Sequence, residues 1–453
     1  MCGVVGVFGT DEAAKVAYAA LWHLQHRGSE SAGIASSDQG RILSIIKKGN
    51  LSQVFKDEET LESLTGRLAV GHVRYSTSGD KSSSEGDRQP ICYPSKAIAH
   101  NGNFTNGPSM REKLISIGRL LRTPGSDTEP VLHLVSSSKE KTLEGKFIDA
   151  LNQMSGAYSF TAIWDDKLVV GRDPFGYRPL AIGRNGASHI IASEQKALEM
   201  VEATGIREIN PGELIIVDDS GVNSYEIGKV SRRQQCIFEH VYFARPDTKI
   251  FGSEHEVAIT RILQGRNLAI NDDVEADIVV PVPDSGVYPA LGYARERGLE
   301  YTLGLSRSHN AGRTFIIPTQ EGRIKGVSLK LTAIPELFRE KRIILVDDSI
   351  VRGTTSKRIV KMVRDAGATE VHVRSSSPRV EGPCFYGIDT PIKSELIASK
   401  KSDEEIRKYI GADSILFNTV DNLMASVTNS QDYCNACFTL DYANNLGDFA
   451  GNV

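Results

Sequence analysis

One stretch decides the fold of the second half of the chain: Ile343-Ile344-Leu345-Val346-Asp347-Asp348-Ser349-Ile350-Val351-Arg352-Gly353-Thr354-Thr355-Ser356. Its first four residues are apolar and predict a fully buried parallel strand. Two adjacent carboxylates follow, then a loop with Gly and hydroxyl groups, then a helical stretch over Lys357–Ala366. This order places acids and the N–H groups of residues 352–355 at the carboxyl edge of an open α/β sheet, where such folds bind ligands. A phosphate joined to a diol, such as a ribose phosphate, fits this pattern.

The same stretch resembles the phosphoribosyl pyrophosphate signature of the type I phosphoribosyltransferases. The resemblance implies that Asp347 and Asp348 hold the ribose hydroxyls and that the following loop holds the 5′-phosphate. The loop residues concerned are Ser349, Arg352, Gly353, Thr354 and Thr355. The alternative is that the two acids only cap a helix, but a cap usually needs one acid.

Size and composition narrow the class of protein. The chain has 453 residues, 40% hydrophobic and 24% charged, which predicts two or three globular domains. A net charge of −4 argues against a nucleic-acid binder. We find no apolar run of the ~20 residues that span a membrane and no signal-peptide pattern at the start. We therefore expect six reduced cysteines and a cytoplasmic protein without membrane or nucleic-acid partners.

The two halves of the chain differ in pattern, and we predict domains at 1–230 and 231–453. Short apolar runs fill the first half, with helices expected over Asp11–His26, Met110–Ile117, Thr128–Ser138 and Leu143–Gln153. This predicts two layered sheets between helices. The polar stretch Asp218–Gln235 is typical of a linker. Strands and helices alternate after it, which indicates a parallel, doubly wound sheet.

Cys2 is a candidate nucleophile. It follows the initiator Met, and removal of that Met would leave Cys2 with a free α-amine. An α-amine has an ordinary pKa of about 7.7–8.0, so thiol and amine together form a nucleophile–base pair. A Cys at position 2 is often incidental, so the prediction depends on the polar blocks at the ends of the apolar runs. These are Leu24–Gly28, Ala32–Ile34, Gly71–Thr77, Ala99–Asn103, Ser126–Glu129 and Arg172–Leu180.

These blocks resemble the class II glutamine amidotransferase domain, an N-terminal nucleophile hydrolase with an αββα sandwich. The resemblance assigns Cys2 as nucleophile and Asn101 with the Gly102 N–H as oxyanion hole. It assigns the glutamine carboxylate to Arg74 and the α-ammonium to Asp127, with Arg27 and Gly28 nearby. An ordinary turn explains Asn101-Gly102 equally well in isolation, and His72 and His100 are most simply core histidines. Ser29 occupies a position at which this domain family usually has Gln.

A second anion-binding turn is predicted where Asp284, Ser285 and Gly286 follow the apolar run Val280–Val282. A tight strand-to-helix turn is the alternative. About sixty residues separate it from the first loop, as two anchors for a sugar with two phosphate groups require. The basic stretch Leu305–Lys330, which includes Arg313 and Lys330, predicts a lid over a leaving pyrophosphate, with a solvated loop as the alternative. Residues 307–311 differ from the sequence that is usual at this position in the family that the two halves together resemble.

Four cysteines of the second half could hold a metal: Cys236, Cys384, Cys434 and Cys437. Their chemistry alone leaves a redox pair, zinc and a 4Fe–4S cluster open. Cys92 fits no such pattern and is expected to be a small buried residue.

Both halves together resemble the amidophosphoribosyltransferase family over almost the full length. One branch of that family carries a 4Fe–4S cluster, and its ligand positions match these four cysteines. The resemblance implies that glutamine yields ammonia, which attacks C1 of phosphoribosyl pyrophosphate and gives phosphoribosylamine, the first committed step of purine synthesis. It implies Mg²⁺ near Ser285, Asp347 and Asp348, a homotetramer, and inhibition by purine nucleotides. The alternatives are an amidotransferase with another acceptor, and a non-catalytic regulator that binds phosphoribosyl pyrophosphate.

Overall fold

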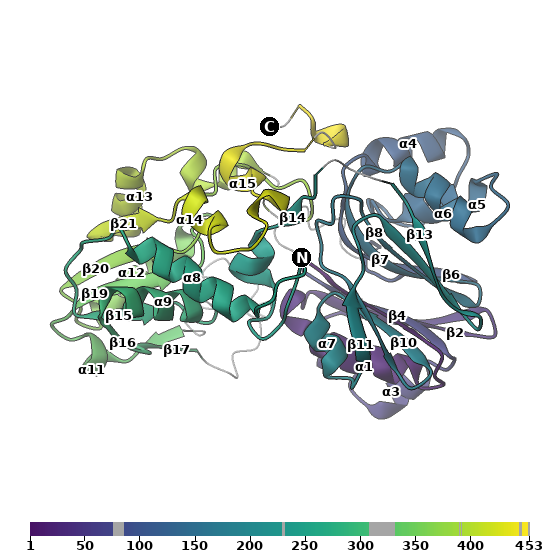
Figure 1. Ribbon diagram of the computed structural model, residues 1–453, viewed down its shortest axis with the longest axis horizontal. Coiled ribbons are helices and arrows are strands. Elements are labelled where there is room, and N and C mark those ends of the chain that lie inside the picture. The colour runs from purple at the N-terminus through teal and green to yellow at the C-terminus, as the bar shows by residue number, and fades with distance from the viewer. Residues whose placement is uncertain are drawn as a thin grey trace.

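The structure is a computed structural model that describes residues 1–75, 86–228, 232–307, 331–388, 390, 392–443 and 446–451. Two lobes lie side by side, and the N-terminus lies between them (Figure 1). The lobe coloured purple to teal contains the first half of the chain, and the green to yellow lobe contains the second. Within the described ranges, no helix is both long enough and apolar enough to cross a membrane.

The first lobe consists of two antiparallel sheets with the strand orders β11-β9-β10-β1-β4-β2-β3 and β13-β12-β8-β7-β6-β5. The strands of the first sheet are β1 (Gly3–Phe8), β2 (Ser31–Asp38), β3 (Arg41–Lys48), β4 (Leu68–Arg74), β9 (Ala181–Asn185), β10 (Ser188–Ala192) and β11 (Thr204–Glu208). Those of the second are β5 (Ile91–Tyr93), β6 (Lys96–Phe104), β7 (Gly156–Trp164), β8 (Lys167–Arg172), β12 (Glu213–Asp218) and β13 (Gly221–Glu226).

Helices cover the outer face of each sheet. The first sheet is covered by α1 (Ala13–Trp22), α2 (Leu51–Val54), α3 (Glu58–Glu62) and α7 (Gln195–Glu199), and the second by α4 (Gly107–Ser116), α5 (Glu129–Ser137) and α6 (Leu143–Asn152). Because side chains alternate along a strand, β1 directs Val5 and Val7 toward the helices and Val4 and Phe8 toward the other sheet. These layers confirm the predicted αββα sandwich.

The predicted linker Asp218–Gln235 was wrong in its first part. Residues 221–226 form β13, which pairs with β12 along its whole length at the edge of the second sheet. The strand is polar and mostly exposed, so it lacks the apolar alternation that identifies a strand in sequence. The first lobe therefore extends at least to Glu226.

The second lobe contains a parallel sheet with the order β16-β15-β19-β20-β21. Its strands are β15 (Ile278–Pro281), β16 (Glu300–Tyr301), β19 (Arg342–Asp347), β20 (Glu370–Ser375) and β21 (Ser414–Phe417). One face is covered by α8 (Val257–Ala269) and α9 (Val287–Arg297), the other by α11 (Pro335–Phe338), α12 (Thr354–Asp365) and α13 (Asp403–Ile410).

The central position of β19 in the sheet explains why its sequence is apolar without alternation. Ile343 and Leu345 face one helical layer, and Ile344 and Val346 face the other. The strand is central, so both faces are buried. The doubly wound sheet is confirmed. Helix α12 begins at Thr354, three residues before the predicted start at Lys357, so Thr354 and Thr355 of the predicted phosphate loop belong to its first turn.

Several shorter elements complete the second half of the chain. Strands β17 (Leu305–Arg307) and β18 (Leu331–Ala333) form a small antiparallel ribbon. Strand β14 (Gln235–Cys236) pairs in parallel with β22 (Tyr433–Cys434), and α14 (Val420–Met424) and α15 (Ala436–Thr439) flank the latter. In Figure 1 the yellow C-terminal segment runs across the top of the junction toward α4. There the Ser109 N–H donates to the Asp448 carboxylate at 2.8 Å.

Candidate active sites

Cys2 lies one residue before β1, at the end of the sandwich that meets the second lobe. Its backbone N–H donates to Asn101 Oδ1 at 3.1 Å, across the gap between the two sheets. Because Oδ1 is the acceptor in this contact, the amide orientation is determined and Nδ2 is left as a donor. Asn101 is fully buried, and Nδ2 has no partner among the described residues. A buried, unpaired donor next to a thiol is what an oxyanion hole requires.

The backbone conformation at position 102 and the close approach of a neighbouring strand require glycine there. The φ of Gly102 is +144°, and a Cβ there would lie 2.1 Å from the Ala157 carbonyl oxygen. No other residue type fits this conformation and this approach. The structure thus brings Cys2, Asn101 and Gly102 together as predicted from sequence, while their catalytic roles stay predictions.

The thiol of Cys2 is activated. Burial raises its pKa, but His72, by its charge and a hydrogen-bonding interaction, and the N-terminal amine lower it further, and the result is a pKa of about 6. Burial lowers the pKa of the N-terminal amine, here on Met1, to about 6. Met1 itself is buried in a cluster with Cys236 and Phe238. Nucleophile and terminus therefore lie at the lobe junction.

The residues predicted to hold glutamine take different positions. Arg74 lies at the end of β4, 3.5 Å from the Glu30 carboxylate, and its buried Nη1 has no partner among the described residues. Asp127 accepts from the Phe104 N–H at 2.7 Å and is half-buried. A Cβ on Gly28 would lie 2.3 Å from the Arg74 carbonyl carbon, so Gly28 permits two backbones to touch. These placements are compatible with an amino-acid pocket.

Arg27 is fully buried and engaged by two carboxylates. Its Nη2 donates to Glu239 at 2.8 Å, and its Nε donates to Glu194. A second buried guanidinium, that of Arg178, donates through Nε to the Tyr386 carbonyl at 3.1 Å and lies 3.9 Å from Glu239. Sequence reasoning gave no role to Glu194 and Glu239, and none to Arg178 beyond its place in the block Arg172–Leu180. The direct role of Arg27 in glutamine binding stays a prediction, because its charge is already paired.

The predicted phosphoribosyl pyrophosphate residues gather at the carboxyl edge of the second sheet. Ser285 Oγ donates to Asp348 at 2.5 Å, which joins the turn before α9 to the end of β19. The Asp348 N–H donates to Asp347 Oδ1 at 2.9 Å, and both acids are over nine-tenths buried. Burial and then the neighbouring Asp348 carboxylate raise the pKa of Asp347. A paired acidic site that is this crowded favours a bound cation.

These residues line a cavity of about 440 Å³. Ser285, Asp347, Asp348 and residues 349 and 352–356 form one side, while Tyr75, Phe238, Tyr242 and Phe243 line it from the lobe junction. Tyr75 directly follows Arg74 of the first site. The cavity therefore extends from the acidic pair toward the amidotransferase lobe.

The side chains of two other residues predicted to bind phosphoribosyl pyrophosphate, Arg352 and Asp284, pair with protein side chains instead. The Arg352 side chain donates to Glu395 at 3.0 Å, so its backbone rather than its guanidinium belongs to the loop. Gly353 has φ +72° at the N-cap of α12. Asp284 forms an ion pair with Arg307. Arg313 and Lys330, with most of the predicted lid, lie outside the described residues.

The four candidate cluster cysteines come to one region. Cys236 and Cys434 are direct partners in the β14–β22 pair, and the Tyr386 N–H donates to Cys384 Sγ at 3.4 Å. Cys437 is close enough to the other three for their charges to raise its pKa, after burial. Among the described residues, however, no group of three or more His, Cys, Asp or Glu side chains has an arrangement that could hold a metal ion.

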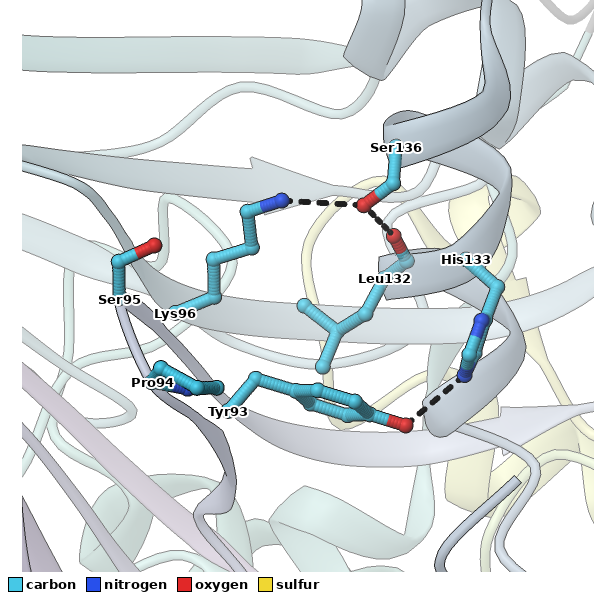
Figure 2. A pocket seen from close by; sticks show the side chains of 7 residues that line it. All are labelled: Tyr93, Pro94, Ser95, Lys96, Leu132, His133 and Ser136. Atoms are coloured by element: carbon cyan, nitrogen blue, oxygen red, sulfur yellow. Dashed lines mark hydrogen bonds between the residues drawn. The ribbon is translucent and has the colours of Figure 1, made fainter. Parts of the chain in front are cut away.

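A separate cavity of about 230 Å³ lies between β5, β6 and α5 (Figure 2). Tyr93 Oη contacts His133 Nε2 at 2.9 Å, and Lys96 Nζ donates to Ser136 Oγ at 3.1 Å. No predicted site residue lines this cavity, and these polar groups pair with each other. We assign it no role.

Comparison with known proteins agrees with this two-site architecture. A family model described as a glutamine amidotransferase domain matches residues 72–200. Amidophosphoribosyltransferase 3 of Arabidopsis thaliana, a chloroplastic protein, is 47% identical over 97% of this chain and 83% of its own length. The amidophosphoribosyltransferase of Archaeoglobus fulgidus is 44% identical over 98% of each chain.

A solved structure shows the same fold. It is the glutamine phosphoribosylpyrophosphate amidotransferase of Bacillus subtilis, complexed with ADP and GMP, which matches with a TM-score of 0.90 and 42% identity over 97% of each chain. Because such relatives cover nearly all of this chain and most of their own length, the chain belongs to the amidophosphoribosyltransferase family, whose members combine a glutamine amidotransferase with a phosphoribosyltransferase.

Proposed function

We propose that this chain releases ammonia from glutamine at Cys2 and transfers it to C1 of phosphoribosyl pyrophosphate, which yields phosphoribosylamine, glutamate and pyrophosphate. The observation that carries the proposal is the pairing of two sites across one junction. An activated N-terminal thiol with a buried free donor lies on one side. A buried Asp–Asp–Ser constellation lies on the other, in a cavity that Tyr75 also lines.

In the first half-reaction, the Cys2 thiolate attacks the glutamine amide carbon. Asn101 Nδ2 and the Gly102 N–H donate to the oxygen that becomes negative, and Arg74 and Asp127 hold the ends of the amino acid. An oxyanion donor of this kind contributes about 10²–10³ in kcat. When the tetrahedral species collapses, the C–N bond breaks, the nitrogen takes up a proton and leaves as ammonia, and a thioester remains. Water then releases glutamate from the thioester and restores Cys2.

In the second half-reaction, Asp347 and Asp348 accept from the ribose hydroxyls, and the backbone of residues 352–355 donates to the 5′-phosphate at the start of α12. The turn at Ser285 and Gly286 holds the pyrophosphate. The aromatic side chains at the junction, Tyr75, Phe238, Tyr242 and Phe243, exclude water from the path between the sites. Ammonia then displaces pyrophosphate at C1.

We also propose Mg²⁺ at the acidic pair. Asp347, Asp348 and Ser285 supply the oxygen ligands that this ion prefers, and the crowding that raises the pKa of Asp347 would be relieved by a cation. When bound, the ion would neutralise charge on the leaving pyrophosphate.

For the cysteines we propose a structural 4Fe–4S cluster held by Cys236, Cys384, Cys434 and Cys437. Four thiols that approach one another in a buried region have the right chemistry and number. Iron and acid-labile sulfide should be found in anaerobically purified protein and should disappear in Cys437→Ser. Stoichiometric zinc without iron would contradict the cluster.

As expectations from the family, we propose a cytoplasmic homotetramer that purine nucleotides inhibit. The Bacillus subtilis relative was solved with ADP and GMP, which supports nucleotide regulation. Addition of either nucleotide should lower the rate of pyrophosphate release, and sedimentation should give the mass of four chains.

The proposed reaction is tested by following glutamate and pyrophosphate together. Wild type should form both in equal amounts when glutamine, phosphoribosyl pyrophosphate and Mg²⁺ are present. Cys2→Ala should lose the glutamine-dependent reaction and keep the ammonia-dependent one, while Asp347→Asn should keep glutamate release and lose pyrophosphate release. Cys92→Ala, which changes a cysteine outside both sites, is the control. Loss of both activities in Cys2→Ala would contradict the division between the sites.

A further inference from the structure

Strand β6, which carries the proposed oxyanion donors, has one side that no other described strand covers beyond its first residues. On this open side the His100 N–H donates to Gln89 Oε1 at 2.6 Å. The Phe104 N–H, four residues on, donates to Asp127 Oδ2 at 2.7 Å on the same side. Because N–H groups alternate between the two sides of a strand, the Gly102 N–H is directed to the open side as well.

Residues 385–387, from the second half of the chain, pack against β6 at Gly102. A Cβ on Gly387 would lie 2.8 Å from both the carbonyl carbon and the carbonyl oxygen of Gly102, and 2.9 Å from its Cα. Gly387 has φ +107°, in the region that favours glycine. The two backbones therefore touch, and only glycine at position 387 permits this approach.

Three further contacts hold this segment beside β6. Asn103 Nδ2 donates to the Phe385 carbonyl oxygen at 2.8 Å. The fully buried Arg178 donates through Nε to the Tyr386 carbonyl oxygen at 3.1 Å. The Tyr386 ring stacks on the ring of Tyr177, with the centroids 4.3 Å apart. The segment is thus fixed by several side chains of the amidotransferase lobe.

The same stretch of chain continues into the second site. Ile388 directly follows Gly387 and lines the cavity of about 440 Å³ that contains the acidic pair. Thr390 lines this cavity too, and its carbonyl oxygen accepts from the Cys384 N–H at 3.1 Å. The position of Gly387 is therefore determined by contacts with both halves of the chain.

We propose that Gly387 is a positioning residue of the glutaminase site, supplied by the phosphoribosyltransferase half. Its backbone supports the Gly102 peptide from the side on which β6 has no neighbouring strand, so that the Gly102 N–H points at the amide oxygen of glutamine. Such support matters because a misplacement of about 1 Å can cost about 10²-fold in rate. The inference rests on the proposed function, since it takes Gly102 as a donor to the oxyanion formed at Cys2.

Gly387→Ala tests this contact in the full-length protein, with glutamate release measured as a function of glutamine concentration. The added Cβ meets the Gly102 backbone, so glutaminase kcat should fall at least about 10-fold. The KM for glutamine should change little, because the oxyanion donor acts only in the transition state. Gly411→Ala is the matched control and should keep wild-type kinetics. Gly411 also has a positive φ, +79°, but a Cβ there would meet nothing within 4 Å.

Alkylation of Cys2 by iodoacetamide separates positioning from general damage. Iodoacetamide reacts at a saturated carbon, so the reaction needs the thiolate but no oxyanion donor. Its rate, followed by mass spectrometry of the N-terminal peptide, should be the same in Gly387→Ala and wild type, and ammonia-dependent transfer should persist. Three results would each overturn the proposal: a wild-type kcat in Gly387→Ala, an equal fall of kcat in Gly411→Ala, or a fall of alkylation that parallels the fall of kcat.

Asn103→Ala decides the case in which Gly387→Ala does not fold. It removes the donor to the Phe385 carbonyl and leaves Gly387 itself unchanged. Glutaminase kcat should fall about 3- to 10-fold, as the loss of one hydrogen bond implies, again with wild-type alkylation of Cys2. An unchanged kcat would then overturn the proposal. Wild type that releases no glutamate would instead refute the proposed function.

Discussion

At the residue scale, Asn101 connects nucleophile and oxyanion hole through one amide. Its oxygen accepts from the Cys2 N–H, and its nitrogen is left buried and unpaired within the described structure. A buried unpaired donor costs roughly 1–3 kcal/mol, so the fold retains it at the expense of stability. Such a cost is typical of groups that gain a partner only during the reaction.

Asn101→Asp tests this division of the amide. The variant keeps the shape and the acceptor for Cys2 but replaces the Nδ2 donor with an oxygen. Glutaminase kcat should fall about 10²–10³-fold, because the oxyanion loses a donor and meets a carboxylate. Ammonia-dependent transfer, measured as pyrophosphate release, should be unchanged. A kcat within a few-fold of wild type would show that Nδ2 does not face the oxyanion.

The pH dependence of glutaminase follows from Cys2. Its pKa of about 6 means that the thiolate is present above that pH and is lost as the pH falls through it. The value of kcat/KM for glutamine, which reports the free enzyme, should therefore decline below about pH 6 and stay level above it until another group titrates. A decline that begins near the ordinary thiol pKa of about 8.5 would contradict an activated thiol.

At the element scale, α8 and α9 determine the position of the Ser285 turn. They cross with their backbones in contact, because a Cβ on Gly265 would lie 1.8 Å from the Pro289 carbonyl oxygen and one on Gly292 would lie 1.9 Å from that of Ile262. Helix α9 follows Ser285 and Gly286 directly. The close crossing therefore sets where the predicted pyrophosphate anchor lies relative to Asp348.

Gly292→Ala should separate these two helices. Overpacking of this kind costs about 1–3 kcal/mol, which thermal denaturation detects as a lower Tm. The KM for phosphoribosyl pyrophosphate should rise because the Ser285 turn moves, while glutaminase is spared. Arg295→Ala, at an exposed position of the same helix, is the control and should leave both values near wild type. A Gly292→Ala protein with an unchanged Tm would refute the tight crossing.

Helices and strands could be predicted from sequence where their apolar side chains are buried on both faces or recur on one face at regular spacing. Strand β19 is buried on both faces and reads as an apolar run, and the amphipathic helices of the sandwich lie where their periodicity places them. The edge strand β13 has mostly exposed side chains, so nothing apolar distinguishes it from a linker. The site motifs were found because each is a block of consecutive polar residues at the end of an apolar run and resembles a known family pattern. The partners of Arg27 were missed because Glu194 and Glu239 lie 167 and 212 residues away.

At the scale of the whole molecule, a buried ion network joins the lobes. Arg27 and Glu194 come from the amidotransferase lobe, and Glu239 follows β14, the strand that pairs with the C-terminal tail. The Arg245 N–H, from the second half, also donates to Glu194 at 3.0 Å. The network lies beside the chain terminus, because Arg27, Arg178 and Glu239 act on the N-terminal amine. The network therefore joins residues of the second half of the chain to the terminus beside Cys2.

Glu239→Gln should break this network while it preserves shape. Arg27 would keep only Glu194, and the Arg178 guanidinium would lose the carboxylate that lies 3.9 Å away. Loss of one partner of a buried ion pair costs about 3–5 kcal/mol. The Tm should drop, and the pH dependence of Cys2 alkylation by iodoacetamide should change. Asp365→Asn, which breaks the exposed Lys361–Asp365 pair, is the control and should have little effect. Equal effects of the two substitutions would show that the junction network does not hold the lobes.

The central claim is that nitrogen released at Cys2 is consumed at the Asp347–Asp348 site inside the same protein. It is tested most directly with glutamine labelled with ¹⁵N in its amide, in the presence of excess unlabelled ammonium. The label in trapped phosphoribosylamine is then measured by mass spectrometry. We predict product that is almost fully ¹⁵N-labelled, because ammonia passes through the lobe junction without reaching solvent. A label diluted to the isotope ratio of the bulk ammonium would contradict the account.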